Sequence, residues 1–220
     1  MGPGDCAVPR VVECLARLQA RVFDAPAVWL GYSMGARIAL AAAAEEVPGS
    51  ALLLESGSPG LADPVARAER RVLDEERARR LEADGMEAFV EEWLRLPLFQ
   101  GLHQAPAEVQ AAARATRIAQ DPARMAASLR EGGTGVQPSY WDRLSEIRRP
   151  VRLAVGVKDR KFVAVARAMV DRLPDVALRE IPGVGHTVHL EAPDLWIRWV
   201  QDALAEVHPP RPPRPRSLEP

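Results

Sequence analysis

A serine flanked by glycines carries the strongest chemical signal in the sequence. Residues 31–37 read GYSMGAR, which places Ser33 in a Gly-x-Ser-x-Gly pattern between an apolar run and an alanine-rich stretch. Between a strand and a helix this pattern predicts a nucleophile elbow, because the strained turn exposes the hydroxyl and the helix N-terminus directs free N–H groups at a developing oxyanion. We expect both flanking glycines, Gly31 and Gly35, to leave no room for a larger side chain. The alternative is a structural turn.

Two downstream residues could complete a catalytic triad with Ser33. Asp159 follows the apolar run VRLAVGV, and His186 lies in the glycine-rich segment IPGVGHTVHLEAP. The order Ser, acid, His is that of enzymes with a nucleophile elbow, and α/β sites form at the carboxyl ends of strands. We predict that His186 activates the serine while Asp159 fixes the histidine tautomer. The alternatives are a solvated turn at Asp159, a loop histidine bonded to backbone, and a metal pair of His186 with His189, which lacks a third ligand.

The elements that must position these residues alternate between strand and helix. Continuous apolar runs predict buried parallel strands, and amphipathic runs predict helices. The predicted strands are 27–30, 51–56, 151–157 and 177–181, and the predicted helices are 8–22, 34–46, 162–173 and 194–207. Between the second and third strands the sequence is dominated by long Arg/Glu/Ala/Leu helices. The order predicts an α/β fold whose sheet carries a helical cap.

The same pattern divides the chain into four segments. Residues 1–61 are predicted to form a partial core with the elbow, 62–147 the helical cap, and 148–207 the core with the acid and the histidine. The last segment, 208–220, is rich in proline and arginine and is predicted to be extended and disordered. It could dock a partner, but a solvated tail is the favoured interpretation.

Composition argues against several classes of partner. The net charge of -1 and the pI near 6.5 disfavour nucleic acid and anionic membranes as partners. No apolar run approaches the length of a membrane span and no signal core is evident, so we expect a soluble, cytoplasmic protein without membrane insertion. Two cysteines near the N-terminus, Cys6 and Cys14, favour a reducing compartment without a disulfide.

Five segments together resemble one enzyme family. GYSMGARIAL, LLLESGSPGL, GTGVQPSYWDRL, VGVKDRKF and PGVGHTVHLEAP are similar to the 2-succinyl-6-hydroxy-2,4-cyclohexadiene-1-carboxylate synthases, which have the α/β-hydrolase fold. The resemblance implies a lyase of menaquinone biosynthesis that uses a hydrolase triad. It implies elimination of pyruvate from 2-succinyl-5-enolpyruvyl-6-hydroxy-3-cyclohexene-1-carboxylate, a small polyanionic carboxylate, without cofactor or metal. Oligomeric state is not implied.

A polyanionic substrate requires cations in the pocket. Arg37 follows Ser33 by one helical turn, so both side chains lie on one helix face, although a surface position is the alternative. The cap is not a basic patch, because residues 63–140 hold 11 arginines against 13 acidic residues. An anion site there must be built from individual arginines.

The resemblance also implies the remaining pocket residues. It places cap arginines at Arg70 and Arg117, although Arg67, Arg71 and Arg114 are close alternatives. Tyr32 and Trp141 match aromatic positions that line the family's pocket, with core packing as the alternative.

The sequence departs from the family at its N-terminus. Family members carry further N-terminal strands, one of which ends in a His-Gly loop that donates an oxyanion-hole N–H. Here the four histidines precede Gln, Thr, Leu and Pro. The backbone N–H of Met34 is the remaining predicted donor, and losing one such donor costs on the order of 2.7–4 kcal/mol.

With those strands missing, we expect an open sheet edge and partial loss of cover for strands 27–30 and 51–56. The chain as given is then predicted to be poorly soluble or self-associating. Two other functions therefore stay open. One is a carboxylic-ester hydrolase on the same triad, and the other is an inactive remnant that acts as an interaction module through its tail.

Overall fold

A four-stranded parallel sheet forms the centre of the molecule. The computed structural model describes residues 6–207, so the proline- and arginine-rich segment 208–220 lies outside the described residues. The strands are β1 (Val28–Tyr32), β2 (Ala51–Glu55), β3 (Val151–Gly156) and β4 (Val176–Ile181). They lie in the order β1-β2-β3-β4, and every neighbouring pair is parallel. All carboxyl ends therefore meet at one edge, as an α/β site requires.

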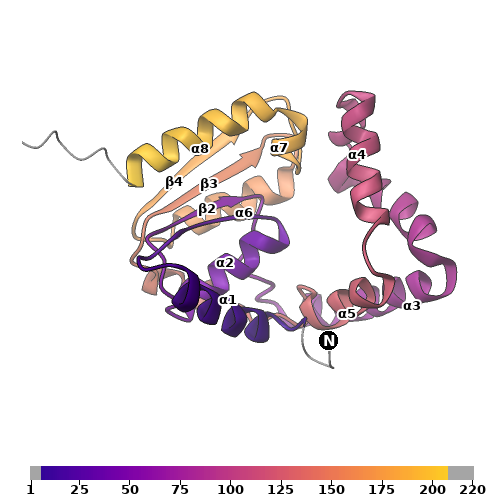
Figure 1. The fold of residues 1–220 in the computed structure, drawn as a ribbon, viewed down its shortest axis with the longest axis horizontal. Coiled ribbons are helices and arrows are strands. Elements are labelled where there is room, and N and C mark those ends of the chain that lie inside the picture. Colours follow the sequence, from indigo (N-terminus) through magenta and orange to yellow (C-terminus); the bar gives the residue numbers. More distant parts are fainter. Residues whose placement is uncertain (1–5, 208–220) are drawn as a thin grey trace, which may run out of the picture.

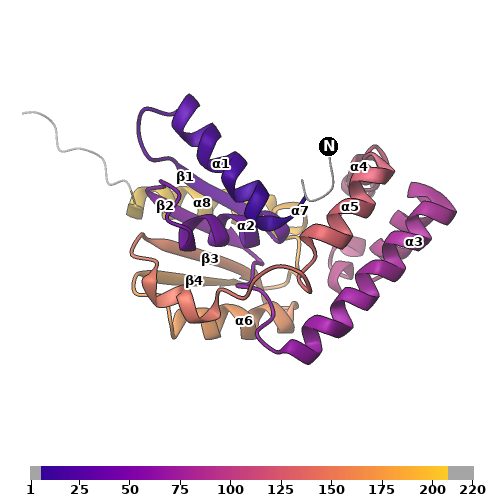
Figure 2. The same ribbon diagram turned by 90° about the horizontal axis from the view of Figure 1, so that it is seen from below.

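Helices cover both faces of this sheet (Figures 1 and 2). On one face lie α1, α2, α6 and the 3-10 turn η3, and on the other lie α7 and α8. Their bounds are α1 (Val8–Val22), α2 (Met34–Ala44), α6 (Arg160–Val170), η3 (Trp141–Glu146), α7 (Val188–Glu191) and α8 (Pro193–Val207). The predicted elements are thus present, with ends that differ by a few residues. The predicted strand 27–30 continues to Tyr32, and the predicted helix 162–173 begins at Arg160.

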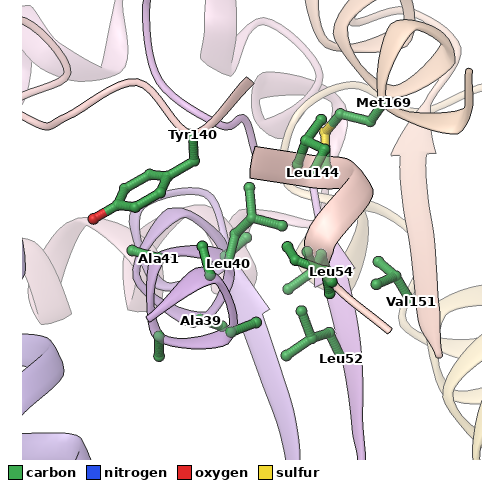
Figure 3. Close-up of a cluster of buried hydrophobic side chains, with 14 of the residues drawn as sticks. Ala39, Leu40, Ala41, Leu52, Leu54, Tyr140, Leu144, Val151 and Met169 are labelled. Carbon is green, nitrogen blue, oxygen red and sulfur yellow. The ribbon is translucent and has the colours of Figure 1, made fainter. Parts of the chain in front are cut away.

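Strand β2 is covered on both of its faces. All five of its residues are buried, as expected for a continuous apolar strand covered on both faces. Leu52 and Leu54 pack into the cluster below α2, which also contains Leu144 of η3 (Figure 3), whereas Leu53 packs against α8. The expectation that this strand lacks cover is therefore wrong. In contrast, β1 is the edge strand, and its Leu30 is 47% exposed.

The segment between β2 and β3 contains only helices and turns. Its elements are α3 (Pro64–Leu94), η1 (Pro97–Phe99), η2 (Leu102–Gln104), α4 (Ala107–Ile118) and α5 (Pro122–Gly132), followed by η3, which packs against the core. Asp63 caps α3 by accepting from two backbone N–H groups, and α3 is kinked at Gly85, where φ is 84°. None of the described helices is both long enough and apolar enough to cross a membrane. We use "cap" below for α3, α4, α5, η1 and η2, which stand together beside the sheet (Figure 1).

Candidate active site

The turn between β1 and α2 holds Ser33 in a strained conformation. Its φ is 47° and its ψ is −105°, a combination that non-glycine residues rarely adopt and that surrounding structure must enforce. The Ser33 N–H donates to the Glu55 carbonyl oxygen at 2.9 Å, which ties the turn to the end of β2. The strand–turn–helix geometry predicted for an elbow is therefore present.

The two glycines of the motif differ in what they contribute. A Cβ at Gly31 would lie 2.6 Å from the backbone of Gly35 and from the Ala36 nitrogen, so no larger residue fits there. A Cβ at Gly35 would have no heavy atom within 4 Å outside its own helix backbone. The expectation that both positions are sterically closed is correct for Gly31 and wrong for Gly35. The reason is that α2 turns back over β1, which crowds only the strand side of the turn.

Two neighbouring loops bring the acid and the histidine to the same edge. Asp159 follows β3 and caps α6, because its Oδ1 accepts from the Phe162 N–H at 3.3 Å. His186 follows β4 on the segment before α7. The two loops are joined by a backbone bond in which Lys158 N donates to the Val184 oxygen at 2.9 Å. Consequently, both side chains reach Ser33 from adjacent strand ends.

Ser33, His186 and Asp159 form one hydrogen-bonded chain. The His186 Nε2 atom lies 2.9 Å from Ser33 Oγ, and its Nδ1 lies 2.6 Å from Asp159 Oδ2. A carboxylate only accepts, so Nδ1 carries the proton and Nε2 is left to accept from the serine hydroxyl. The side chain of His186 is fully buried. This is the geometry in which a histidine can take a proton from a serine.

Aromatic rings enclose the imidazole. The ring centroids of Phe162, Tyr32 and Phe99 lie 4.6, 5.4 and 6.3 Å from that of His186. Burial raises the pKa of the Tyr32 phenol, and the nearby Glu55 raises it further, so this group stays neutral at physiological pH. The surrounding rings shield the buried imidazole from solvent, which strengthens its electrostatic interactions with Asp159.

The triad opens into a cavity of about 910 Å³ between the sheet and the cap. This volume lies in the upper part of the range for small-molecule sites. The cap contributes apolar side chains such as Phe89, Trp93 and Leu98, while the core contributes Ser33, His186 and other residues of the turns at the strand ends. Predicted residues that line the cavity are Tyr32, Ser33, Met34, Arg37, Arg70, Arg117, Asp159 and His186.

Arg37 is a buried cation without a carboxylate partner among the described residues. It is 9% exposed, and its guanidinium donates to the Gln137 side-chain oxygen and, at 3.0 Å, to the Gly132 carbonyl. Burial, with a smaller effect of Arg70, lowers its pKa to about 10, so it remains charged at neutral pH. Both direct acceptors are neutral and the nearby Asp74 carboxylate offsets only part of the charge, so positive charge is left for an anion in the cavity.

The two cap arginines have different surroundings. The Nε of Arg70 lies 2.8 Å from both carboxylate oxygens of Asp74, which is buried, so much of its charge is neutralised. Arg117 donates to the Ala113 carbonyl and lies over the ring of Phe99, and in the described part of the chain it has no carboxylate partner. Burial lowers the pKa of its guanidinium. Arg37 and Arg117 are thus the stronger candidates for holding an anion.

Comparisons with known proteins agree on one family. Residues 2–199 match the alpha/beta hydrolase family. A putative 2-succinyl-6-hydroxy-2,4-cyclohexadiene-1-carboxylate synthase of Bacillus subtilis is 39% identical over 181 residues, which are 81% of this chain and 65% of that protein. The synthase of Salmonella paratyphi C is 30% identical over 93% of this chain and 79% of its own length. The chain belongs to this synthase family of alpha/beta hydrolases. It spans less than two thirds of the Bacillus relative.

Solved structures extend the same similarity. MenH from S. aureus superposes with a TM-score of 0.89 at 38% identity, and the match covers 91% of this chain and 76% of that one. A thermophilic esterase from Thermogutta terrifontis superposes with a TM-score of 0.78 at 24% identity, over 94% of this chain and 75% of that one, which shows the fold alone. The predicted α/β-hydrolase fold is therefore confirmed.

Two other residues predicted for the site differ in position. Trp141 does not line the cavity of this synthase-family chain: its indole N–H donates to the Gly60 carbonyl at 3.0 Å, and its ring packs against the core and beside Arg172. The sequence motif identified an aromatic residue, but η3 directs it into the core. Met34 begins α2, so its N–H has no partner within the helix, and an oxyanion role stays a prediction.

Several residues next to the triad have roles that the sequence did not predict. The buried carboxylate of Glu55 accepts from the backbone N–H of His189 at 3.2 Å and lies 2.8 Å from the His189 ring nitrogen Nδ1. His189 is therefore an ion-pair or hydrogen-bond partner, and the part of the chain that the structure describes has no cluster of three or more metal-ligating side chains. Gln137, the partner of Arg37, lies inside the quoted GTGVQP segment. The available signal was a glutamine directly before Pro138 in a glycine-rich segment.

Proposed function

We propose that the protein eliminates pyruvate from 2-succinyl-5-enolpyruvyl-6-hydroxy-3-cyclohexene-1-carboxylate and so acts as a lyase in menaquinone biosynthesis. The observation that carries the proposal is a hydrogen-bonded Ser33–His186–Asp159 chain that opens into a cavity whose lining includes the cations Arg37 and Arg117, for which the described residues supply no carboxylate hydrogen-bond partner. Membership in the synthase family supports this choice over other reactions of the fold.

The triad acts here as a base and not as a covalent nucleophile. His186 Nε2 takes the proton of Ser33 Oγ, and Asp159 stabilises the imidazolium that forms. The serine oxygen removes the proton from C2 of the ring, and the C–H electrons form the C2=C3 double bond. The electrons of the existing C3=C4 double bond move to C4=C5, and the C5–O bond to the enolpyruvyl group breaks. Pyruvate leaves as its enolate and is protonated. No cofactor is needed for this sequence of steps.

The cations have a defined part in this mechanism. The substrate carries several carboxylates that lose water when they enter a cavity lined by aromatic rings. Arg37 and Arg117 replace part of that hydration with charge-assisted hydrogen bonds. Arg37 also lies one helical turn beyond Ser33, so it fixes the substrate directly beside the base. The N–H of Met34 is placed to stabilise negative charge on the leaving enolate.

Pyruvate release tests the proposal. The purified chain is mixed with the succinyl-cyclohexene substrate, and pyruvate is followed by NADH oxidation with lactate dehydrogenase. We expect turnover that falls on the order of 10³-fold or more in Ser33→Ala, with an unchanged unfolding temperature. Absence of pyruvate from the wild-type chain, or equal rates in Ser33→Ala, would falsify the proposal.

A carboxylic-ester hydrolase is the second candidate. The observation that favours it is the apolar cap lining, including Phe89, Trp93 and Leu98, which suits a neutral acyl chain. Turnover of 4-nitrophenyl butyrate measures this activity on the same triad. Arg37→Met separates the two candidates, because it removes an anion contact and should slow pyruvate release while leaving ester turnover intact.

A further inference from the structure

The loop that carries His186 is held by a single carboxylate. Glu191, the last residue of α7, accepts from the Gly185 N–H at 2.6 Å through Oε2 and from the Thr187 N–H at 3.0 Å through Oε1. Its Oε1 also accepts from the Thr187 hydroxyl at 2.8 Å. The two backbone donors flank His186 directly. One side chain therefore fixes the 184–185 and 186–187 peptide planes around the histidine.

These hydrogen bonds to Glu191 take the place of the backbone hydrogen bonds that a strand or helix would supply. The segment from Pro182 to Thr187 lies between β4 and α7 and belongs to neither. Charge-assisted hydrogen bonds to a carboxylate are shorter and stronger than neutral ones, and an ionised carboxylate has acceptor capacity for all three donors. The carboxylate is itself held in place, because Glu191 N donates to the Thr187 oxygen at 2.8 Å and closes the turn of α7.

The same carboxylate contacts the cap. A Cβ at Gly101, in the turn between η1 and η2, would lie 1.9 Å from Glu191 Oε2 and 2.4 Å from its Cδ. Only glycine lets the cap turn rest this closely on the loop of the histidine. The turn also supplies Phe99, which lies edge-on to the His186 ring, and Gln104, which accepts from Lys158 Nζ at 2.8 Å. The cap turn and the histidine loop are therefore packed as one unit.

We propose that Glu191 is a positioning residue that aligns His186 with Ser33 and couples this alignment to the seating of the cap turn at Gly101. It has no hydrogen bond to Ser33 or Asp159, and it acts through the backbone at residues 185 and 187 and through the Thr187 hydroxyl. We expect a substitution of Glu191 to change the rate of the proton-transfer step and not the affinity for substrate. The part that concerns pyruvate release rests on the proposed function, whereas the part that concerns Ser33 reactivity does not.

Glu191→Gln tests the role of the carboxylate, with Glu180→Gln as the control. The amide keeps one acceptor oxygen but turns N–H donors toward the loop, so one backbone N–H loses its partner. A fluorophosphonate probe measures alignment without the natural substrate: Ser33 Oγ attacks phosphorus, His186 takes the proton, and fluoride leaves. We expect labelling and kcat to fall on the order of 10-fold to 100-fold with KM within about twofold. Glu180 pairs with Arg167 on the surface, and its variant should match the wild type.

The amplitude and the rate of labelling separate positioning from folding. A purely structural role would reduce the fraction of protein that reacts and leave the rate constant of the reactive fraction unchanged. Such a result, or equal rates in Glu191→Gln and wild type, overturns the inference. If Glu191→Gln does not fold, Gly101→Ala decides, since it displaces the carboxylate and should slow labelling on its own. A labelling rate in Gly101→Ala equal to that of the wild type would contradict the proposed coupling between the His186 loop and the cap turn.

The outcomes for the two proposals are distinguishable. A wild-type chain that is labelled at Ser33 but releases no pyruvate contradicts the proposed function, and the inference about Glu191 is still judged by the labelling rates. A wild-type chain that is not labelled at Ser33, while a Ser33→Ala control behaves identically, overturns the inference, because no reactive histidine is then being positioned.

Discussion

The core and the cap build the two halves of one cavity by different physical means. In the core, the triad residues lie directly after strands, and backbone bonds between neighbouring loops fix where they point. In the cap, the joints between helices carry exposed ion pairs, such as those of Arg130 with Glu75 and Glu82 and of Arg114 with Glu91. The triad residues are therefore positioned by backbone geometry, whereas the cap helices also contact one another through exposed side-chain pairs.

Glycine substitutions give the largest test of this difference. Gly31→Ala forces a Cβ to 2.6 Å from the backbone of α2, whereas Gly85→Ala meets no atom within 4 Å and only strains a residue with φ of 84°. We expect Gly31→Ala to lower kcat/KM on the order of 100-fold, because Ser33 shifts, and stability by about 1–3 kcal/mol. Because Gly85 has a ψ of 172°, in a region that is essentially restricted to glycine, Gly85→Ala should cost about 1–3 kcal/mol with kcat within about twofold.

Urea unfolding and the pyruvate assay together check both variants. Gly35→Ala is the matched control inside the elbow, since its Cβ would enter open space. The comparison fails if Gly85→Ala impairs kcat as strongly as Gly31→Ala does, because the cap backbone would then share in the catalytic geometry.

Substitution of the arginines tests the part that side chains play in binding an anion in the cavity. Arg37→Met removes a cation that has only neutral acceptors, and we expect kcat/KM for pyruvate release to fall about 10- to 100-fold, the value of a hydrogen bond to a charged group. Arg70→Met should have a smaller effect, since Asp74 already neutralises much of that charge. Arg71, which donates to the Gly135 carbonyl and does not line the cavity, supplies the control variant Arg71→Met.

Steady-state kinetics with the succinyl-cyclohexene substrate rank these variants. The expected order of damage is Arg37→Met, then Arg70→Met, then Arg71→Met. The reverse order of the first two would mean that the cap, and not the core, supplies the principal anion contact.

The core was predictable from sequence because its chemistry is tied to strand ends. Short apolar runs located β1 to β4, and the position of Ser33, Asp159 and His186 after three of them was enough to bring the three together. The steric demand at Gly35 was misjudged, since it depends on the path of α2 over β1. The cover of β2 was also misjudged: its continuous apolar run indicated burial on both faces, and α2, η3 and α8 supply that cover.

The cap could be predicted only in outline. Its helices follow from composition, but the partner of each arginine depends on how the helices pack. The same holds for Arg37 in the core helix α2, whose guanidinium donates to Gln137 at a separation of 100 residues that no local pattern predicts. Trp141 was misplaced for the same reason, since the direction of η3 is set by core residues such as Leu144. Glu191 was missed because an acidic residue at the end of a four-residue helix looks solvated.

The smallest expected effect comes from the exposed charges of the cap. Arg130 joins α5 to α3 by donating to Glu75 and Glu82, and these carboxylates raise its pKa. All three side chains are about one-third exposed or more, so water and salt screen the pairs. The joint is held instead by the apolar cluster that contains Leu81 and Leu129. We therefore expect Arg130→Gln to leave the unfolding temperature nearly unchanged at physiological salt.

Leu81→Ala is the reference for this measurement, because truncation of a fully buried leucine costs about 2–5 kcal/mol. Thermal unfolding of both variants is measured at low and at physiological ionic strength. It compares the contributions of the ion pairs and of apolar packing to stability at the same helix joint. A small loss in Arg130→Gln that appears only at low salt fits a screened surface pair. A loss of stability in Arg130→Gln as large as that in Leu81→Ala, at either ionic strength, would show that ion pairs hold α5 against α3. It would contradict the view that apolar packing holds this joint and that the charged pairs on the cap surface contribute little.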